Sequence, residues 1–119
     1  MARPVHFEIL ANDPEKMAEF YRKTLGWKIA TWNDPQAYWL VTTGPDDTPG
    51  INGGIMERHF QQAVINTVQV ESLEQMIASI EVAGGKKVFG PHEIQGVGTH
   101  AYCADPEGNM FGILQPTAK

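Results

Sequence analysis

The chain repeats itself at a constant offset of 59 residues (from 15 to 74, for example), and this repeat restricts the fold more than any other feature. Over residues 6–29, four residue pairs are identical at that offset: Glu15/Glu74, Met17/Met76, Gly26/Gly85 and Lys28/Lys87. The order of predicted elements repeats as well, as strand, helix and three strands. The helix of such a unit covers one face of its sheet, so the other face needs a partner. The sequence therefore predicts an α+β fold of two βαβββ modules.

The first module is predicted from a strand over residues 5–10 and a helix that follows it directly. Asp13 is a good N-cap, Pro14 suits the first helical position, and Gly26 suits a left-handed C-cap. Apolar residues recur at helical spacing between them, so one face of the helix is expected to pack on a sheet. Strands are expected over residues 27–32, 38–43 and 51–58, with a turn at residues 33–35 and a polar loop at residues 44–50.

The second module follows the same order. A strand over residues 64–70 leads to Ser72 and Gln75, which form a capping box, and the helix is expected to end at Gly84 and Gly85. The remaining strands are expected over residues 87–89, 97–103 and 110–114, with Gly90–Pro91 closing the first. Residues 105–108 match a type I turn, interpreted as structural. His59 and His92 fall in predicted loops and are assigned no role.

Size and composition indicate one domain over residues 1–119, with module one at about 1–60 and module two at about 61–119. The net charge is −5 and there is no Lys/Arg cluster, which argues against nucleic acid as a partner. No apolar run is long enough to span a membrane, and no signal peptide is recognised at the start. Cys103 is the only cysteine, which fits a reducing compartment, so a cytoplasmic protein is expected. Cys103 itself is interpreted as a small packed residue.

Two ionisable residues share one face of the first strand. His6 and Glu8 alternate with Phe7 and Ile9, because side chains along a strand point to opposite faces with period two. If Glu8 were buried among apolar neighbours only, its pKa would rise, which would suit a general base. His6 and Glu8 are therefore the candidate catalytic residues. The candidate ligand-binding residues, taken in pairs that share a strand face, are Tyr38 and Leu40, Ile65 and Thr67, and His100 and Tyr102.

Two sets of motifs resemble those of the vicinal oxygen chelate superfamily, which includes glyoxalase I, bleomycin-resistance proteins, fosfomycin-resistance enzymes and extradiol dioxygenases. The motifs are His6-Phe7-Glu8-Ile9, Asp13-Pro14, Phe20-Tyr21 and Leu25-Gly26-Trp27, then Asp105-Pro106-Glu107-Gly108-Asn109 and Phe111-Gly112-Ile113. The resemblance covers essentially the whole chain and is closest to small bacterial glyoxalase-like proteins. It implies that the two βαβββ modules form an open cupped β-barrel and that the protein is a homodimer.

Metal-dependent members of that superfamily hold one divalent ion with four side chains, from the first and last strands of both modules. The resemblance places His6 at the first ligand position and Glu57 at its counterpart on the last strand of module one. At the two positions in module two stand Ile65 and Gly112, neither of which can bind a metal. Catalytic metal sites usually need at least three protein ligands, so a bound divalent metal is not favoured, and the cofactor stays unknown.

The resemblance and the incomplete ligand set together favour a glyoxalase/bleomycin-resistance-like protein. It would bind a small, polar aromatic molecule in the cup between the modules without an intact metal site. One alternative is a metal-dependent lyase, isomerase or dioxygenase that uses His6, Glu57 and a third ligand from Glu8, His100 or a partner chain. Another alternative is a drug-sequestering resistance protein. Whether the chain is an enzyme stays open at this point.

Overall fold

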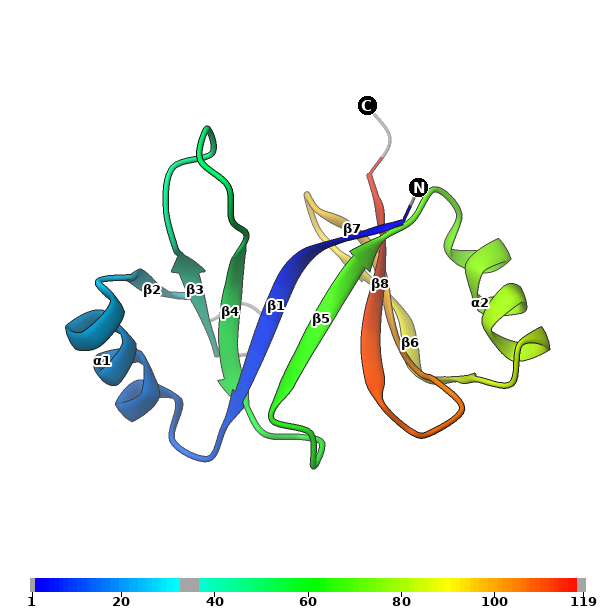
Figure 1. Cartoon of the computed structure of the whole chain (residues 1–119), viewed down its shortest axis with the longest axis horizontal. Helices are drawn as coiled ribbons and strands as arrows, with labels where there is room; N and C mark the ends of the chain where they lie inside the picture. The colour runs from blue at the N-terminus through cyan, green and yellow to red at the C-terminus, as the bar shows by residue number, and fades with distance from the viewer. Residues whose placement is uncertain (1, 33–36, 118–119) are drawn as a thin grey trace. The chain divides into compact units, whose positions relative to one another are not determined.

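The computed structural model describes residues 2–32 and 37–117, in which two helices and eight strands are found (Figure 1). In chain order the elements are β1 (Arg3–Ala11), α1 (Pro14–Leu25), β2 (Lys28–Trp32), β3 (Tyr38–Thr42), β4 (Asn52–Glu57), β5 (Val64–Gln69), α2 (Leu73–Val82), β6 (Lys86–Ile94), β7 (Gly98–Ala104) and β8 (Met110–Pro116). The predicted fold class, α+β with two βαβββ modules, is confirmed. The turn expected at residues 33–35 lies outside the described residues.

The chain divides into two compact units, residues 6–65 and residues 1–5 with 66–119. In the first unit the strand order is β2-β3-β4-β1, with β1 parallel to β4 and the other neighbours antiparallel. In the second unit the order is β5-β8-β7-β6, with β5 parallel to β8 and the other neighbours antiparallel. Each unit thus pairs its first strand with its last, and the two units repeat one topology.

The helices begin where the sequence predicts. The Asp13 side chain accepts a hydrogen bond from the Lys16 backbone N–H at 3.1 Å, and Gly26 ends α1 in the left-handed conformation at φ 71°. Ser72 accepts from the Gln75 backbone N–H at 3.2 Å and so caps α2. These caps satisfy backbone donors that a helix start otherwise leaves without partners, which fixes where each helix leaves its sheet.

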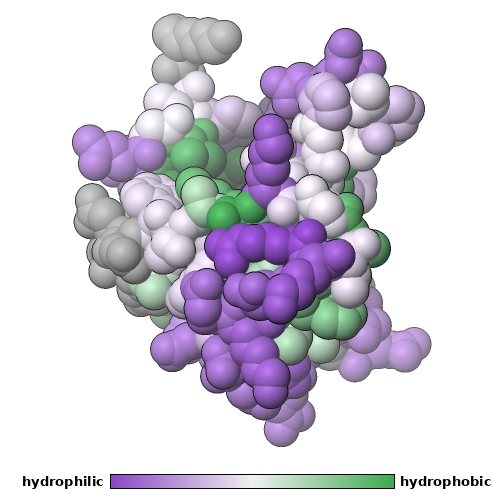
Figure 2. All heavy atoms as spheres, turned by 90° about the vertical axis from the view of Figure 1, so that its left-hand side faces the viewer, coloured by the Kyte–Doolittle hydropathy of each residue, from purple (hydrophilic) through white to green (hydrophobic). Residues whose placement is uncertain are grey.

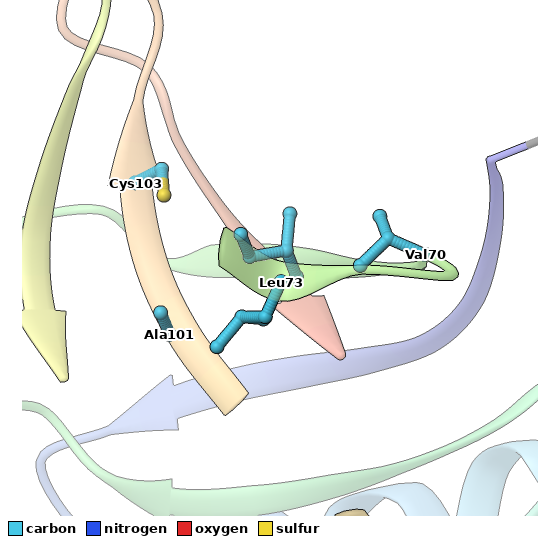
Figure 3. Packing of buried hydrophobic residues seen from close by; sticks show 5 residues of the cluster. Val70, Leu73, Ala101 and Cys103 are labelled. Carbon is cyan, nitrogen blue, oxygen red and sulfur yellow. The ribbon is translucent and has the colours of Figure 1, made fainter. Parts of the chain in front are cut away.

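Each helix packs on one face of its own module's sheet. In module one the buried residues of this core are Ala11, Ala18, Val41 and Ile55. In module two they are Val70, Leu73, Ala101, Cys103 and Ile113. Figure 3 shows Ala101 and Cys103 on one strand beside Leu73 and Val70. Because these cores use alternate strand residues, the remaining residues of each strand face away from the helix.

Strand β6 is longer than predicted, and this corrects the interpretation of His92. The strand continues through Gly90 and Pro91 to Ile94, and His92 is the register partner of His100 rather than a loop residue. Register shifts between Lys87 and Phe89 and between Phe89 and His92 absorb the irregular segment. Because β6 is the terminal strand of its module, a proline costs no ladder hydrogen bond on its open side.

The outer surface around α1 is mainly hydrophilic, with hydrophobic areas between the polar side chains (Figure 2). The exposed large apolar residues of this helix are Phe20 and Leu25. Arg22 donates from Nη2 to the backbone oxygen of Ile29 at 2.8 Å and so ties the helix to β2. No helix in the described part of the chain has the length and apolar character needed to cross a membrane.

Candidate functional site

The face of module one that points away from α1 carries the predicted polar residues. Phe7 and Ile9 of β1 pack in the α1 core, so His6 and Glu8, which alternate with them, point to the other face. Trp39 and Val41 of β3 pack in the same core, which likewise places Tyr38 and Leu40 on the face away from the helix. Three separately predicted site residues, His6, Glu8 and Tyr38, are brought together here.

The Tyr38 hydroxyl connects His6 and Glu8. It donates a hydrogen bond to Glu8 Oε2 at 2.9 Å, and its oxygen lies 2.9 Å from His6 Nε2. Glu8 is 7% exposed, so its charged group is held largely out of solvent and next to polar partners. The apolar surroundings considered for Glu8 from the sequence are therefore not what the structure shows, because a phenol and an imidazole lie in series with the carboxylate.

Gly54 is the reason Tyr38 can reach across the sheet. Gly54 of β4 is the register partner of Glu8 on one side and of Leu40 on the other. A Cβ on Gly54 would overlap the hydroxyl and ring of Tyr38. The missing side chain therefore leaves the space that the phenol occupies on its way from β3 over β4 to β1. A glycine within a strand often marks a bulge or the close approach of another group, and at Gly54 that group is the Tyr38 phenol.

Burial sets the protonation state of the His6 imidazole. Removal from solvent lowers the pKa of His6 from its ordinary value, and the nearby negative charge of Glu8 opposes this with a smaller effect. The imidazole is therefore mainly neutral at neutral pH, with one nitrogen carrying a proton and the other a lone pair. A neutral imidazole in this position can accept a hydrogen bond or a proton from a bound molecule.

Trp32 is a surface residue of this site that sequence reasoning missed. Trp32 of β2 is the register partner of Tyr38, and directly paired residues of antiparallel strands share a face. Trp32 is 39% exposed and Leu40 is 42% exposed, so both side chains offer apolar surface to solvent on this face. Strand alternation places Leu40 on the face of Tyr38, but placing Trp32 there as well requires the register of β2 against β3. The polar group thus borders on an open apolar area.

Module two has the same geometry with different residues. Thr67 of β5 and Tyr102 of β7 are the register partners of Gly112, as Glu8 and Leu40 are of Gly54. A Cβ on Gly112 would meet His100 Nε2 and Thr67 Oγ1, each at 2.6 Å. His100 and Thr67 are thus brought together, and the His100 ring contacts Tyr102 edge to face with centroids 4.6 Å apart.

The module-two residues are more buried than His6, Tyr38 and Leu40 of module one. Ile65 and Thr67 are both almost completely enclosed, and His100 and Tyr102 are also buried. The Thr67 hydroxyl is buried with no hydrogen-bond partner among residues 2–32 and 37–117. Ile65 stands at the repeat position of His6, so this module has no imidazole at the corresponding place on its first strand. These four residues stay predictions as ligand contacts.

The residues present do not fit a divalent metal. Glu57 is the register partner of Ala11, which packs in the α1 core, whereas His6 is the register partner of Asn52 on the opposite face. The structure therefore does not bring His6 and Glu57 together. Ile65 and Gly112, at the other two expected positions, have no ligating atoms. The described part of the chain contains no group of three or more His, Cys, Asp or Glu residues that could hold a metal ion.

Cys103 and Asp105, which lie outside the site, stabilise the fold of module two. Cys103 is fully buried in the α2 core, and burial raises the pKa of its thiol, which disfavours the reactive thiolate. Asp105 accepts hydrogen bonds from the backbone N–H groups of Glu107 and Asn109 and from the Asn109 amide. These bonds hold the turn between β7 and β8 together.

Comparison with known proteins gives one family match over most of the chain. The family model described as a glyoxalase-like domain matches residues 5–114. An anthracycline biosynthesis protein, DnrV, from Streptomyces peucetius is 26% identical over 125 residues, which cover 92% of this chain and 46% of that protein. This chain therefore spans about half the length of that curated relative. A glyoxylase-like domain-containing protein from Didymella fabae is 29% identical over 122 residues, covering 94% of this chain and 92% of that protein.

Solved structures share the fold at low sequence identity. Methylmalonyl-CoA epimerase from Mycobacterium tuberculosis matches with a TM-score of 0.70 at 15% identity, covering 97% of this chain and 88% of that one. A variant of the Streptomyces coelicolor methylmalonyl-CoA epimerase, in complex with 2-nitronate-propionyl-CoA, matches with a TM-score of 0.70 at 17% identity, covering 98% of each chain. At these identities the likeness concerns the fold alone.

Proposed function

This chain belongs to the glyoxalase-like domain family, and we propose from that premise that it binds a small aromatic molecule without needing a metal ion. The bound molecule would lie on the face of module one that points away from α1. The observation that carries the proposal is the hydrogen-bonded series Glu8–Tyr38–His6 beside the exposed side chains of Trp32 and Leu40. Small-molecule sites typically combine an apolar lining with a few placed polar groups.

The apolar part of this face suits a flat ligand. Trp32 offers an indole ring that can stack, and Leu40 offers an aliphatic surface on the adjoining strand. On the same face, Ala30 is the register partner of Leu40, and its small side chain leaves room for a planar molecule to lie against the sheet. The relative from Streptomyces peucetius is named for anthracycline biosynthesis, which also favours an aromatic ligand class.

Calorimetric titration of chelator-treated protein with 1-naphthol would test this proposal. Binding is expected to persist after removal of metals and to weaken about fivefold in Trp32→Ala, because a stacked aromatic contact contributes roughly 1 kcal/mol. Phe20→Ala is the matched control, since Phe20 is an exposed aromatic residue of α1 and lies outside this face. Binding that requires added metal, or that Trp32→Ala leaves unchanged, would overturn the proposal.

Proton transfer on the bound molecule is a second candidate, which would make the protein an enzyme. The observation that favours it is that a carboxylate, a phenol and an imidazole are hydrogen-bonded in series. A ketone such as 1-tetralone would then exchange its C–H next to the carbonyl for deuterium in D2O faster with wild type than with Tyr38→Phe. Tight binding without exchange would instead support the sequestering alternative.

We propose a cytoplasmic homodimer for the assembled protein. Support comes from the exposed apolar residues Phe20 and Leu25 on α1 and from the terminal position of β2 in its module, whose outer edge needs cover. Light scattering coupled to size-exclusion chromatography would measure the mass directly. A monomer at all concentrations would exclude the dimer.

A further inference from the structure

The hydrogen bonds of Tyr38 determine which ring nitrogen of His6 carries the proton. A hydroxyl has a single hydrogen, and Tyr38 donates it to Glu8 Oε2. The 2.9 Å contact between the Tyr38 oxygen and His6 Nε2 must therefore use a hydrogen on Nε2. A neutral imidazole carries one N–H, so the assignment from this network leaves a lone pair on His6 Nδ1.

The direction of donation in the two hydrogen bonds is fixed by the groups at the ends of the series, Glu8 and His6. A carboxylate can only accept hydrogen bonds, so Glu8 directs the Tyr38 hydrogen toward itself. Among the described strand residues of module one, the other charged residue on this face is Lys28, which lies two positions before Ala30 on β2, on the far side from Trp32. An ammonium group likewise offers no acceptor. Burial lowers the pKa of His6, which keeps the ring in the neutral form that has a lone pair.

We infer that His6 Nδ1 is a hydrogen-bond acceptor for the ligand, so the site selects aromatic molecules that bear a hydroxyl or another N–H or O–H donor over those that carry acceptors only. This inference rests on the proposed function and names its ligand class. A phenol donates its hydrogen to Nδ1, whereas the corresponding methyl ether leaves Nδ1 and its own oxygen facing each other as two acceptors. Sites built around one hydrogen-bonding group reject analogues that lack the matching group more strongly than apolar sites reject a change of size.

The test compares 1-naphthol with 1-methoxynaphthalene by calorimetric titration at pH 7.5. Wild type is expected to bind the naphthol about fivefold more tightly, because one hydrogen bond contributes roughly 1 kcal/mol. In Tyr38→Phe the imidazole is no longer held in one tautomer, so the ratio is expected to fall below about three. Tyr21→Phe removes the same hydroxyl from α1, whose residue Tyr21 packs in the core on the other sheet face, and should keep the ratio of wild type.

The possible outcomes distinguish a failure of the inferred donor preference from a failure of the proposed function. Equal affinity for the two naphthalenes in wild type overturns the inferred donor preference and leaves the proposed function standing. A preference that survives unchanged in Tyr38→Phe also overturns it, because the selection would then not come from the His6 tautomer. Binding of neither molecule overturns the proposed function together with the inference.

The tautomer can be measured without any ligand. Two-bond nitrogen–proton correlation spectra of 15N-histidine-labelled protein distinguish a ring protonated at Nε2 from one protonated at Nδ1. We expect the Nε2–H form of His6 in wild type and a mixture of both forms in Tyr38→Phe. An Nδ1–H form in wild type would overturn the inference even if the Tyr38→Phe protein failed to fold.

Discussion

The phenol of Tyr38 occupies the space where any residue other than glycine at position 54 would place its Cβ. This relationship lets Tyr38 lean over β4 and hydrogen-bond to two residues of β1 that are 30 and 32 positions away in sequence. The glycine is needed here for its size. The polar series Glu8–Tyr38–His6 therefore depends on Gly54, which has no side chain and contributes only the space that the phenol fills.

Gly54→Ala is expected to displace Tyr38 and break both of its hydrogen bonds. Leaving the buried Glu8 without this donor should cost about 1–3 kcal/mol of the free energy of unfolding. Binding of 1-naphthol should weaken together with stability. Urea denaturation and titration of the same preparation would measure the two effects.

Gly44→Ala serves as the matched control for that substitution. A Cβ on Gly44 would meet only the Thr48 hydroxyl oxygen, at an ordinary contact distance of 3.6 Å. We expect a change within about 0.5 kcal/mol, as for most surface substitutions. If Gly54→Ala were equally mild, the close fit of Tyr38 over Gly54 would be wrong.

The sequence predicts the two modules and His6, Glu8 and Tyr38 as site residues, but not the hydrogen bonds among these three side chains. Alternation within a strand places His6 and Glu8 on one face, because that needs only the period of two. Pairing Tyr38 with them requires the register of β3 against β4 and of β4 against β1, which depends on loop lengths and packing. Trp32 was missed for the same reason, and His92 because bulges carry β6 past Gly90 and Pro91.

The prediction of Glu57 as a metal ligand failed because it depended on strand register. A position on the last strand of module one can be chosen from a family pattern, but a shift of one residue moves a side chain to the other face of the sheet. Here the register partner of Glu57 is Ala11, in the helix-facing core layer. The polar loop before β4 gives no sequence signal for that register.

Thr67→Val is expected to stabilise the protein or to leave its stability unchanged. Thr67 is 1% exposed, and its hydroxyl has no hydrogen-bond partner in the described part of the chain. Replacing it with a methyl group of similar size removes the cost of burying an unsatisfied hydroxyl, about 1 kcal/mol. Thermal and urea unfolding would measure the change.

Thr43→Val provides the contrast for Thr67→Val. The Thr43 hydroxyl donates to the backbone oxygen of Ile51 at 2.7 Å, so its removal is expected to destabilise by roughly 1 kcal/mol. Opposite signs for the two substitutions would support the assignment of the two hydroxyls. A loss above about 1 kcal/mol in Thr67→Val would instead show that its hydroxyl is satisfied.

The pKa of His6 predicts a loss of stability in weakly acidic solution. Burial lowers this pKa below its ordinary value of 6.5, so the unfolded chain binds the proton more tightly than the folded one. The contribution of neutral His6 is complete above about pH 6.5 and declines as the pH falls toward the folded-state pKa. The free energy of unfolding should therefore fall more steeply in wild type than in His6→Gln between about pH 6.5 and 5.

Glu8→Gln tests the cause of that shift. The charge of Glu8 partly opposes the effect of burial on His6, so its removal should lower the pKa of His6 further. Proton NMR titration of the His6 ring gives the value in each protein. A higher pKa in Glu8→Gln would contradict the electrostatic role given to Glu8.

Metal addition should leave the stability of this protein unchanged, because His6 and Glu57 lie on opposite faces of the module-one sheet. A metal bound with a Kd of about 1 μM would add about 2.7 kcal/mol at 100 μM metal and raise the Tm by on the order of 10 °C. We expect shifts below about 1 °C for Ni²⁺, Co²⁺, Mn²⁺, Fe²⁺ and Zn²⁺, in wild type and in Glu57→Gln alike. A large shift that His6→Ala abolishes and Glu57→Gln preserves would mean that His6 binds metal with ligands other than Glu57, and the metal-free mode of binding would then be wrong.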